Sequence, residues 1–188
     1  MRLFVALDVP EQTRHLLGEL IQKFESICRG ARWMRPESIH VTLKFIGDVD
    51  ETKLPVIKDS LSQVKFKAPV EIAFRHFGFF PNERHPQVFW LGIEAGPELA
   101  ALASDVGSSL ESAGIPADSR AFKPHLTLAR FKTEEGIAKL RDAVAPVTHQ
   151  SFGATTAAEF HLYESVLNSS GAVHTRLATY RFVEGRTP

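Results

Sequence analysis

The sequence predicts a mixed α/β protein made of two similar halves. Along its 188 residues, short runs rich in β-branched and apolar residues alternate with stretches in which leucine, isoleucine and phenylalanine recur at helical spacing. One phrase is also written twice, as IHVTLKFIG at residues 39–47 and as PHLTLARFK at residues 124–132. These observations predict a single domain of two lobes, spanning 1–188, with an internal duplication.

The spacing of matching residues supports the duplication. Phe4 and Phe89 are 85 positions apart, and so are His40 and His125. The loops differ, because Pro36 lies four residues before the first histidine whereas a proline directly precedes the second. We therefore expect the strands to carry the symmetry.

In the first half, the sequence predicts a strand followed by a helix, a second strand followed by a second helix, and then a hairpin. Strands are expected at 2–8 and 39–46, and helices from Pro10 or Glu11 to about Ile27 and at 51–64. Pro10 suits the first turn of a helix because its missing N–H would have no partner there. Hairpin arms are expected at about 69–79 and 87–94, because the intervening FPNERHPQ is rich in turn residues.

The second half predicts the same order of elements. It reads as strand 88–94, helix 97–114, strand 125–131, helix 133–145 and two final strands at about 157–166 and 173–183.

Composition limits the class of protein. Lys plus Arg and Asp plus Glu are equal at 22 each, so a bound phosphate must be held by a local cluster and not by a bulk positive field. Cys28 is the only cysteine, which excludes an internal disulfide or a multi-cysteine zinc site and favours a reducing cytoplasm. The apolar run before Asp8 is too short for a signal peptide or a membrane span.

The repeated phrase sets a histidine two residues before a threonine. The two-residue period of a strand sends His40 and Thr42 to one face and Val41 to the other. His125 and Thr127 form the second pair. If the lobes pack about an approximate twofold axis, two imidazoles and two hydroxyls surround one cleft, an arrangement that suits a phosphodiester.

Such a site needs no metal or cofactor. One histidine can remove a proton from water while the other protonates the leaving oxygen, and threonine hydroxyls can donate to the phosphate oxygens. Motifs for other catalytic sites are missing from the sequence. The chain has no His-x-His or His-Glu-x-x-His, which would indicate a metal site, and no glycine-flanked serine elbow, which would indicate a serine nucleophile. We therefore expect neither a metal site nor a serine or cysteine nucleophile.

These stretches resemble the two-histidine phosphoesterases, and within them the RNA 2′,3′-cyclic phosphodiesterases, also described as 2′-5′ RNA ligases. The resemblance is carried by MRLFVALDVP, RWMRPESIHVTLKFIGDVD, FPNERHPQVFWLGI, FKPHLTLARF and FHLYESVLNSSGAVHTRLATYRF. It implies a bilobal fold with a central cleft, each lobe an antiparallel sheet with helices outside. It also implies hydrolysis of an RNA-terminal cyclic phosphate to a 2′-phosphate, with His40 as general acid, His125 as general base, and Thr42 and Thr127 holding the phosphate.

Three further residues follow from strand alternation. Arg130 matches the HLTLAR of the family and would contact the phosphate or lie against a nucleobase, but alternation from His125 puts it on the opposite face unless the strand ends or bulges there. The same count puts Phe45 opposite His40, in the core. It puts Lys44 on the face of His40, either near the phosphate or in solvent.

The remaining histidines have no partner motif, so structural or surface positions are expected for them: His15, His76, His85, His149, His161 and His174. His174 also stands where an aromatic residue such as tyrosine is expected from the resemblance. We therefore do not expect His174 to contact a nucleobase.

Two alternative functions stay open. The same chemistry would open a cyclic phosphate on a small nucleotide or an ADP-ribose product, and a non-catalytic module would bind RNA ends in the same cleft. The expected partners are RNA 3′ ends or nucleotides with a 2′,3′-cyclic phosphate. We expect no association with a membrane, and we expect the protein to be a monomer.

Overall fold

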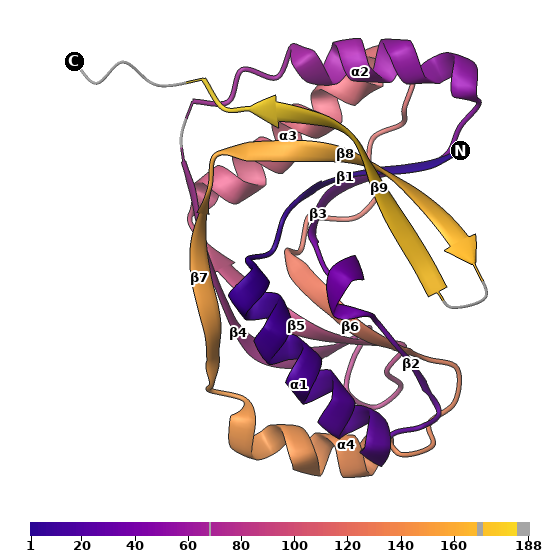
Figure 1. Cartoon of the computed structure of the whole chain (residues 1–188), viewed down its shortest axis with the longest axis vertical. Coiled ribbons are helices and arrows are strands. Elements are labelled where there is room, and N and C mark those ends of the chain that lie inside the picture. Colours follow the sequence, from indigo (N-terminus) through magenta and orange to yellow (C-terminus); the bar gives the residue numbers. More distant parts are fainter. Residues whose placement is uncertain (68, 169–170, 184–188) are drawn as a thin grey trace.

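Two antiparallel sheets form the two lobes of the protein (Figure 1). The computed structural model describes residues 1–67, 69–168 and 171–183. The first sheet has the order β3-β1-β8-β9, with β1 (Arg2–Leu7), β3 (Val41–Asp48), β8 (Glu159–Asn168) and β9 (Gly171–Arg181). The second has the order β2-β6-β5-β4-β7, with β2 (Ala31–Trp33), β4 (Val70–Phe80), β5 (Val88–Ala95), β6 (His125–Phe131) and β7 (Ser151–Ala157).

Helices lie on the outside of both sheets (Figure 1). They are α1 (Glu11–Ile27), α2 (Leu54–Ser62), α3 (Pro97–Ser112) and α4 (Ile137–Val144), with short 3₁₀ turns η1 (Pro36–Ser38), η2 (Glu51–Lys53) and η3 (Ala145–Val147). The predicted bilobal α/β architecture is confirmed. All predicted strands and helices are present, with ends that differ by a few residues.

The helices tie the lobes together. Helix α1 follows β1 of the first sheet but packs on β2 and β7 of the second, and α3 follows β5 of the second sheet but contacts β3 of the first. Buried side chains of α1 recur at helical spacing, as the amphipathic pattern requires: Leu17, Leu20, Ile21 and Phe24. One hydrophobic cluster contains residues of both sheets, among them Leu3 and Phe89.

Two strands were missed by the sequence analysis. Strand β2 has only three residues, too few to show alternation. Strand β7 reads SFGATTA and buries Phe152 as its one large apolar side chain. Helix α4 begins later than the expected 133 because Gly136 has a φ of 81°, a left-handed conformation in which a helix does not continue.

The spacing between the halves needs one correction. Phe4 pairs with Phe45, and the residue that pairs with Arg130 is Val88, not Phe89. Corresponding residues of the two motif strands are 85 positions apart in the sequence, whereas those of the neighbouring strands β1 and β5 are 84 apart. Phe89 consequently packs in the core, while Phe4 lies beside the motif histidine.

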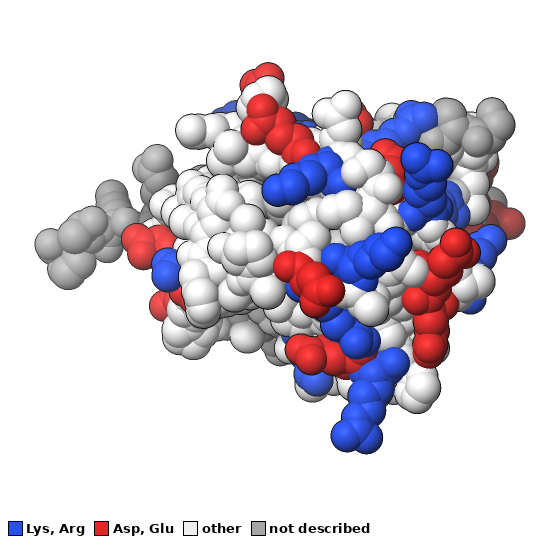
Figure 2. Space-filling model, turned by 90° about the horizontal axis from the view of Figure 1, so that it is seen from below, with Lys and Arg blue, Asp and Glu red and all other residues white. Residues whose placement is uncertain are grey.

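Charges are mixed over the surface at the end of the molecule that carries α1 and α4. Figure 2 shows basic and acidic side chains interspersed there, without a field of one sign. This agrees with the equal numbers of basic and acidic residues in the sequence. Attraction of an anion on this face must come from individual groups.

Candidate active site

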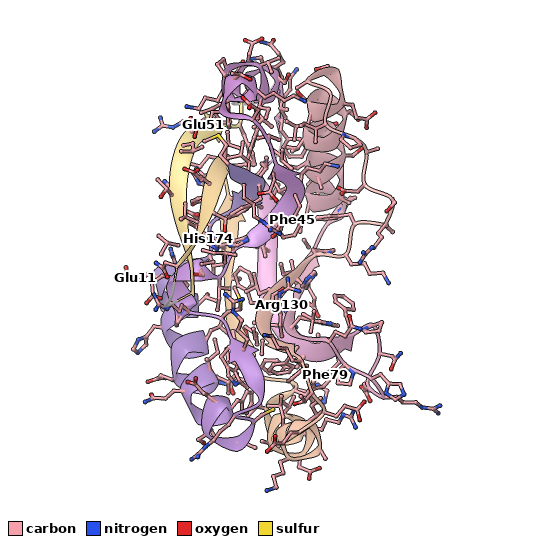
Figure 3. All side chains as sticks on the ribbon, turned by 90° about the vertical axis from the view of Figure 1, so that its right-hand side faces the viewer. Glu11, Phe45, Glu51, Phe79, Arg130 and His174 are labelled. Carbon is pink, nitrogen blue, oxygen red and sulfur yellow. The ribbon has the colours of Figure 1, made fainter. Side chains whose placement is uncertain are left out.

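The two motif strands meet where the two lobes meet. Cα atoms of β3 and β6 come within 8 Å of one another, although the strands belong to different sheets. Figure 3 shows Phe45 of β3 and Arg130 of β6 near the middle of the molecule, with His174 of β9 to one side. The candidate site therefore lies along this junction.

His40 lies immediately before β3, after the turn η1. Its half-buried ring stacks on Phe4 of β1, with 4.4 Å between ring centroids and 25° between planes. His174 meets the same ring edge-on, at 5.2 Å between centroids. The backbone of Ser38 hydrogen-bonds to the imidazole, so stacking and a hydrogen bond fix its orientation.

His125 is the first residue of β6 and is held in the same way. Its Nδ1 lies 2.7 Å from the carbonyl oxygen of Lys123, and the half-buried ring meets Phe80 edge-on at 5.0 Å. A carbonyl only accepts, so Nδ1 carries the hydrogen and Nε2 of the neutral ring is left with its lone pair. In both motifs the backbone partner is two residues before the histidine.

Thr42 and Thr127 follow their histidines by two residues and are half-buried. Neither hydroxyl forms a hydrogen bond within the part of the chain that the structure describes. A hydroxyl in this state can donate to an oxygen of a bound phosphate without breaking an existing bond.

A β-bulge interrupts each motif strand at the matching place. In β3, Leu43 has no partner between the pairs Val5–Lys44 and Ala6–Thr42. In β6, Leu128 has no partner between the pairs Phe89–Ala129 and Trp90–Thr127. The extra residue puts two consecutive side chains into the core and resets the alternation beyond it.

The bulge brings Arg130 back to the face of His125, as the sequence analysis required for a role at the site. Its side chain is exposed, and its charge lies close enough to lower the pKa of His125. The equivalent bulge in β3 makes the prediction for Phe45 wrong. Phe45 is 58% exposed on the face of Thr42 and is not in the core.

The prediction for Lys44 was wrong for the same reason. Its side chain is 3% exposed, and Nζ donates to the carbonyl oxygen of Pro116 at 2.8 Å. Nζ also lies 3.0 Å from an oxygen of Asp118. Lys44 therefore neither approaches a phosphate nor lies in solvent, but anchors the loop before β6.

Burial keeps both motif histidines neutral near pH 7. Burial is the main cause that lowers the pKa of His40 to about 4, and the neighbouring His174 lowers it further, against the opposing effects of the Ser38 backbone and the Asp8 carboxylate. Burial also lowers the pKa of His125, with the charge of Arg130 acting in the same direction. An anion bound beside either ring would favour its charged form.

A cavity of about 460 Å³ opens beside His40. We call it the Asp8 pocket. Its lining includes four aromatic rings, those of Phe4, His40, Tyr163 and His174, and four charged side chains, those of Asp8, Arg14, Glu37 and Arg176.

The carboxylate of Asp8 is held by its neighbours. The hydroxyl of Tyr163 donates to one oxygen at 2.5 Å, and Arg176 donates to the other oxygen and to the tyrosine hydroxyl. His161 is buried nearby and pairs with the hydroxyl of Thr179, as expected of a structural histidine. His174 also lines the pocket, and both its nitrogens are buried without a hydrogen-bond partner in the described chain.

Apart from His40, the residues of the Asp8 pocket were not predicted from the sequence as site residues. They come from β1 and the residue after it, α1, η1 and the residues before β3, β8 and β9, and no short motif joins them. Among the described residues no three or more His, Cys, Asp or Glu side chains gather as metal ligands would. Within the same residues, no helix is long and apolar enough to cross a membrane.

Known proteins resemble this chain over most of its length. The family model described as LigT-like phosphoesterase matches the chain twice, over residues 7–90 and 91–174. An RNA 2′,3′-cyclic phosphodiesterase of Archaeoglobus fulgidus is 35% identical over 180 residues, covering 96% of this chain and 99% of that protein. A protein of the same description from Thermus thermophilus is 35% identical over 190 residues, covering 96% and 89%.

Solved structures show the same fold. A Thermus thermophilus crystal structure superimposes with a TM-score of 0.77 at 32% identity, covering 97% of this chain and 98% of the other. The apo form of E. coli LigT superimposes with a TM-score of 0.75 at 25% identity and the same coverage. The fold and sequence matches together define a phosphoesterase. The chain belongs to the LigT-like phosphoesterase family.

Proposed function

We propose that this protein hydrolyses the 2′,3′-cyclic phosphate at the 3′ end of an RNA and leaves a 2′-phosphate, without a metal ion. The observation that carries the proposal is the matched pair of motifs. Each presents a half-buried imidazole oriented by backbone two residues earlier and a free threonine hydroxyl two residues later. The relatives described above as RNA 2′,3′-cyclic phosphodiesterases support the choice of substrate.

The reaction needs one proton removed and one supplied. Nε2 of His125, as general base, takes a proton from water while the water oxygen attacks phosphorus. The bond from phosphorus to the ribose 3′ oxygen breaks, and His40, as general acid, protonates that oxygen. The phosphate then remains on the 2′ oxygen. The acid and base labels follow the family resemblance.

Three side chains hold the phosphate in this proposal. Thr42 and Thr127 donate their free hydroxyls to its non-bridging oxygens, and Arg130 supplies the positive charge that the neutral imidazoles lack. Because the pKa of His40 is about 4 in the free protein, the general acid must gain its proton as the negative phosphate binds. Substrate binding and protonation of His40 are thus coupled.

The same site can use a ribose 5′-hydroxyl in place of water. Attack by that oxygen would form a 2′-5′ phosphodiester, so we include 2′-5′ RNA ligation as the companion reaction. We also propose that the two lobes descend from one duplicated unit, since the bulges and histidine contacts match across them. A monomer in the cytoplasm stays the expected state.

The experiment is turnover of an RNA oligonucleotide that ends in a 2′,3′-cyclic phosphate. His40→Ala and His125→Ala should each lower kcat by about a hundredfold or more, and the exposed His15→Ala serves as the matched control. Full activity in both motif variants would exclude the mechanism. Parallel assays with a cyclic mononucleotide and a cyclic phosphate of ADP-ribose decide the substrate class, and saturable binding without product would indicate a binding module.

A further inference from the structure

The reaction described above uses neither of the two arginines that line the Asp8 pocket, and only one of them is neutralised by a described carboxylate. Of the two arginines that line it, Arg176 is neutralised by the carboxylate of Asp8. Arg14, in the first turn of α1, is half-buried and forms no ion pair or hydrogen bond through its side chain in the described part of the chain. The pocket therefore holds an unpaired guanidinium beside the general acid.

The nearby carboxylates do not pair with Arg14. Glu11, three residues earlier on α1, is exposed and lies at the outer edge of the molecule in Figure 3. Glu37 lines the same pocket but is exposed and forms no ion pair with Arg14 in the described structure. A guanidinium that is partly removed from water without a partner favours binding of an anion, and its planar fork suits a phosphate.

The chemistry of an RNA end supplies that anion. In the proposed function the cyclic phosphate lies at the motif histidines, and the next negative charge along the strand is the phosphate on the 5′ oxygen of the same nucleotide. A cavity of about 460 Å³ lined by both His40 and Arg14 is large enough for a nucleoside.

We infer that Arg14 binds the 5′-phosphate group of the nucleotide whose cyclic phosphate is hydrolysed. This inference rests on the proposed function and extends it to selectivity. Arg14 would distinguish an RNA terminus, or a nucleotide phosphorylated at its 5′ oxygen, from a cyclic nucleotide that has a free 5′-hydroxyl. Such a contact would make the enzyme favour cleaved RNA over cyclic nucleotides that have a free 5′-hydroxyl.

The test compares three substrates: adenosine 2′,3′-cyclic phosphate, the same compound with a 5′-phosphate, and the dinucleotide ApA with a 2′,3′-cyclic phosphate end. The quantity measured is the ratio of kcat/KM with and without the 5′-phosphoryl group. A charge-assisted contact predicts a ratio of about ten or more in the native protein. The 5′-phosphate and dinucleotide arms distinguish a terminal phosphate from a phosphodiester.

Arg14→Gln should bring this ratio close to one, and Arg14→Lys should leave an intermediate value. Arg29→Gln is the matched control, because Arg29 is exposed just beyond the other end of α1. A native ratio near one would overturn the inference. It would equally be overturned if Arg14→Gln lowered kcat/KM for all three substrates in parallel.

The experiments distinguish failure of the proposed function from failure of the role inferred for Arg14. If the native protein hydrolyses none of the three substrates, the proposed function fails. Binding of adenosine 2′,5′-bisphosphate and of adenosine 2′-monophosphate then decides the role of Arg14 by calorimetry. Tighter binding of the bisphosphate that disappears in Arg14→Gln supports the inference, and equal affinities refute it.

Discussion

Replacing His40 by glutamine should make the protein more resistant to acid relative to the native chain. The folded protein holds the His40 ring at a pKa of about 4, below the ordinary value of 6.5, chiefly by burial. As the pH falls, His40 of the unfolded chain binds a proton near pH 6.5, whereas His40 of the folded chain binds one only near pH 4. The contribution of this site to stability is therefore present above pH 6.5 and is lost as the pH falls toward 4.

The magnitude follows from the two pKa values. One pH unit corresponds to about 1.4 kcal/mol, so the full loss between pH 6.5 and pH 4 is about 3 kcal/mol. Between pH 7 and pH 5 the same relation gives about 2 kcal/mol. Glutamine does not titrate, so His40→Gln should lack this loss. Interaction with the neighbouring His174 and Asp8 will alter the value without changing its sign.

The assay is urea unfolding of the native protein and of His40→Gln at several pH values from 7 to 5. The difference in unfolding free energy between the two proteins should shift by about 2 kcal/mol in favour of the variant as the pH falls. His15→Gln, at an exposed position, controls for loss of a histidine. Parallel curves for the native protein and His40→Gln would refute a buried, neutral His40.

Three other outcomes follow from the same structure. Asp118→Asn should lower the unfolding free energy by about 1–3 kcal/mol because buried Lys44 loses its charged partner, whereas Lys44→Met should cost less, as urea unfolding will show. Phe45→Ala should change stability by less than about 0.5 kcal/mol, against about 2–5 kcal/mol for Leu43→Ala, because only the leucine is buried; equal losses in thermal unfolding would contradict the bulge. Binding of adenosine 2′-monophosphate at pH 7 should take up a proton at His40, and calorimetry in buffers of different ionisation enthalpy should find less uptake in His40→Gln.

The fold and the paired motifs could be predicted because they rest on periodicity. Helix α1 repeats its apolar residues at helical spacing, and the motif strands alternate apolar and polar residues up to Thr42 and Thr127. Strand β7 could not be found, because one buried phenylalanine among small residues gives no such pattern.

The bulges explain the errors at the site. A two-residue period assigns every later side chain to a face, and one extra residue reverses all of them. No residue type marks the bulge at Leu43, so Lys44 and Phe45 were placed on the wrong faces, and Arg130 could be assigned only conditionally. The burial of Lys44 also depends on Pro116 and Asp118 in a distant loop, which local sequence does not reveal.

The most direct test of the central claim is the product formed from an RNA ending in a 2′,3′-cyclic phosphate in the presence of a metal chelator. The two-histidine mechanism predicts a 2′-phosphate end, formed at the same rate with and without chelator. A 3′-phosphate product, or turnover that the chelator abolishes, would contradict it.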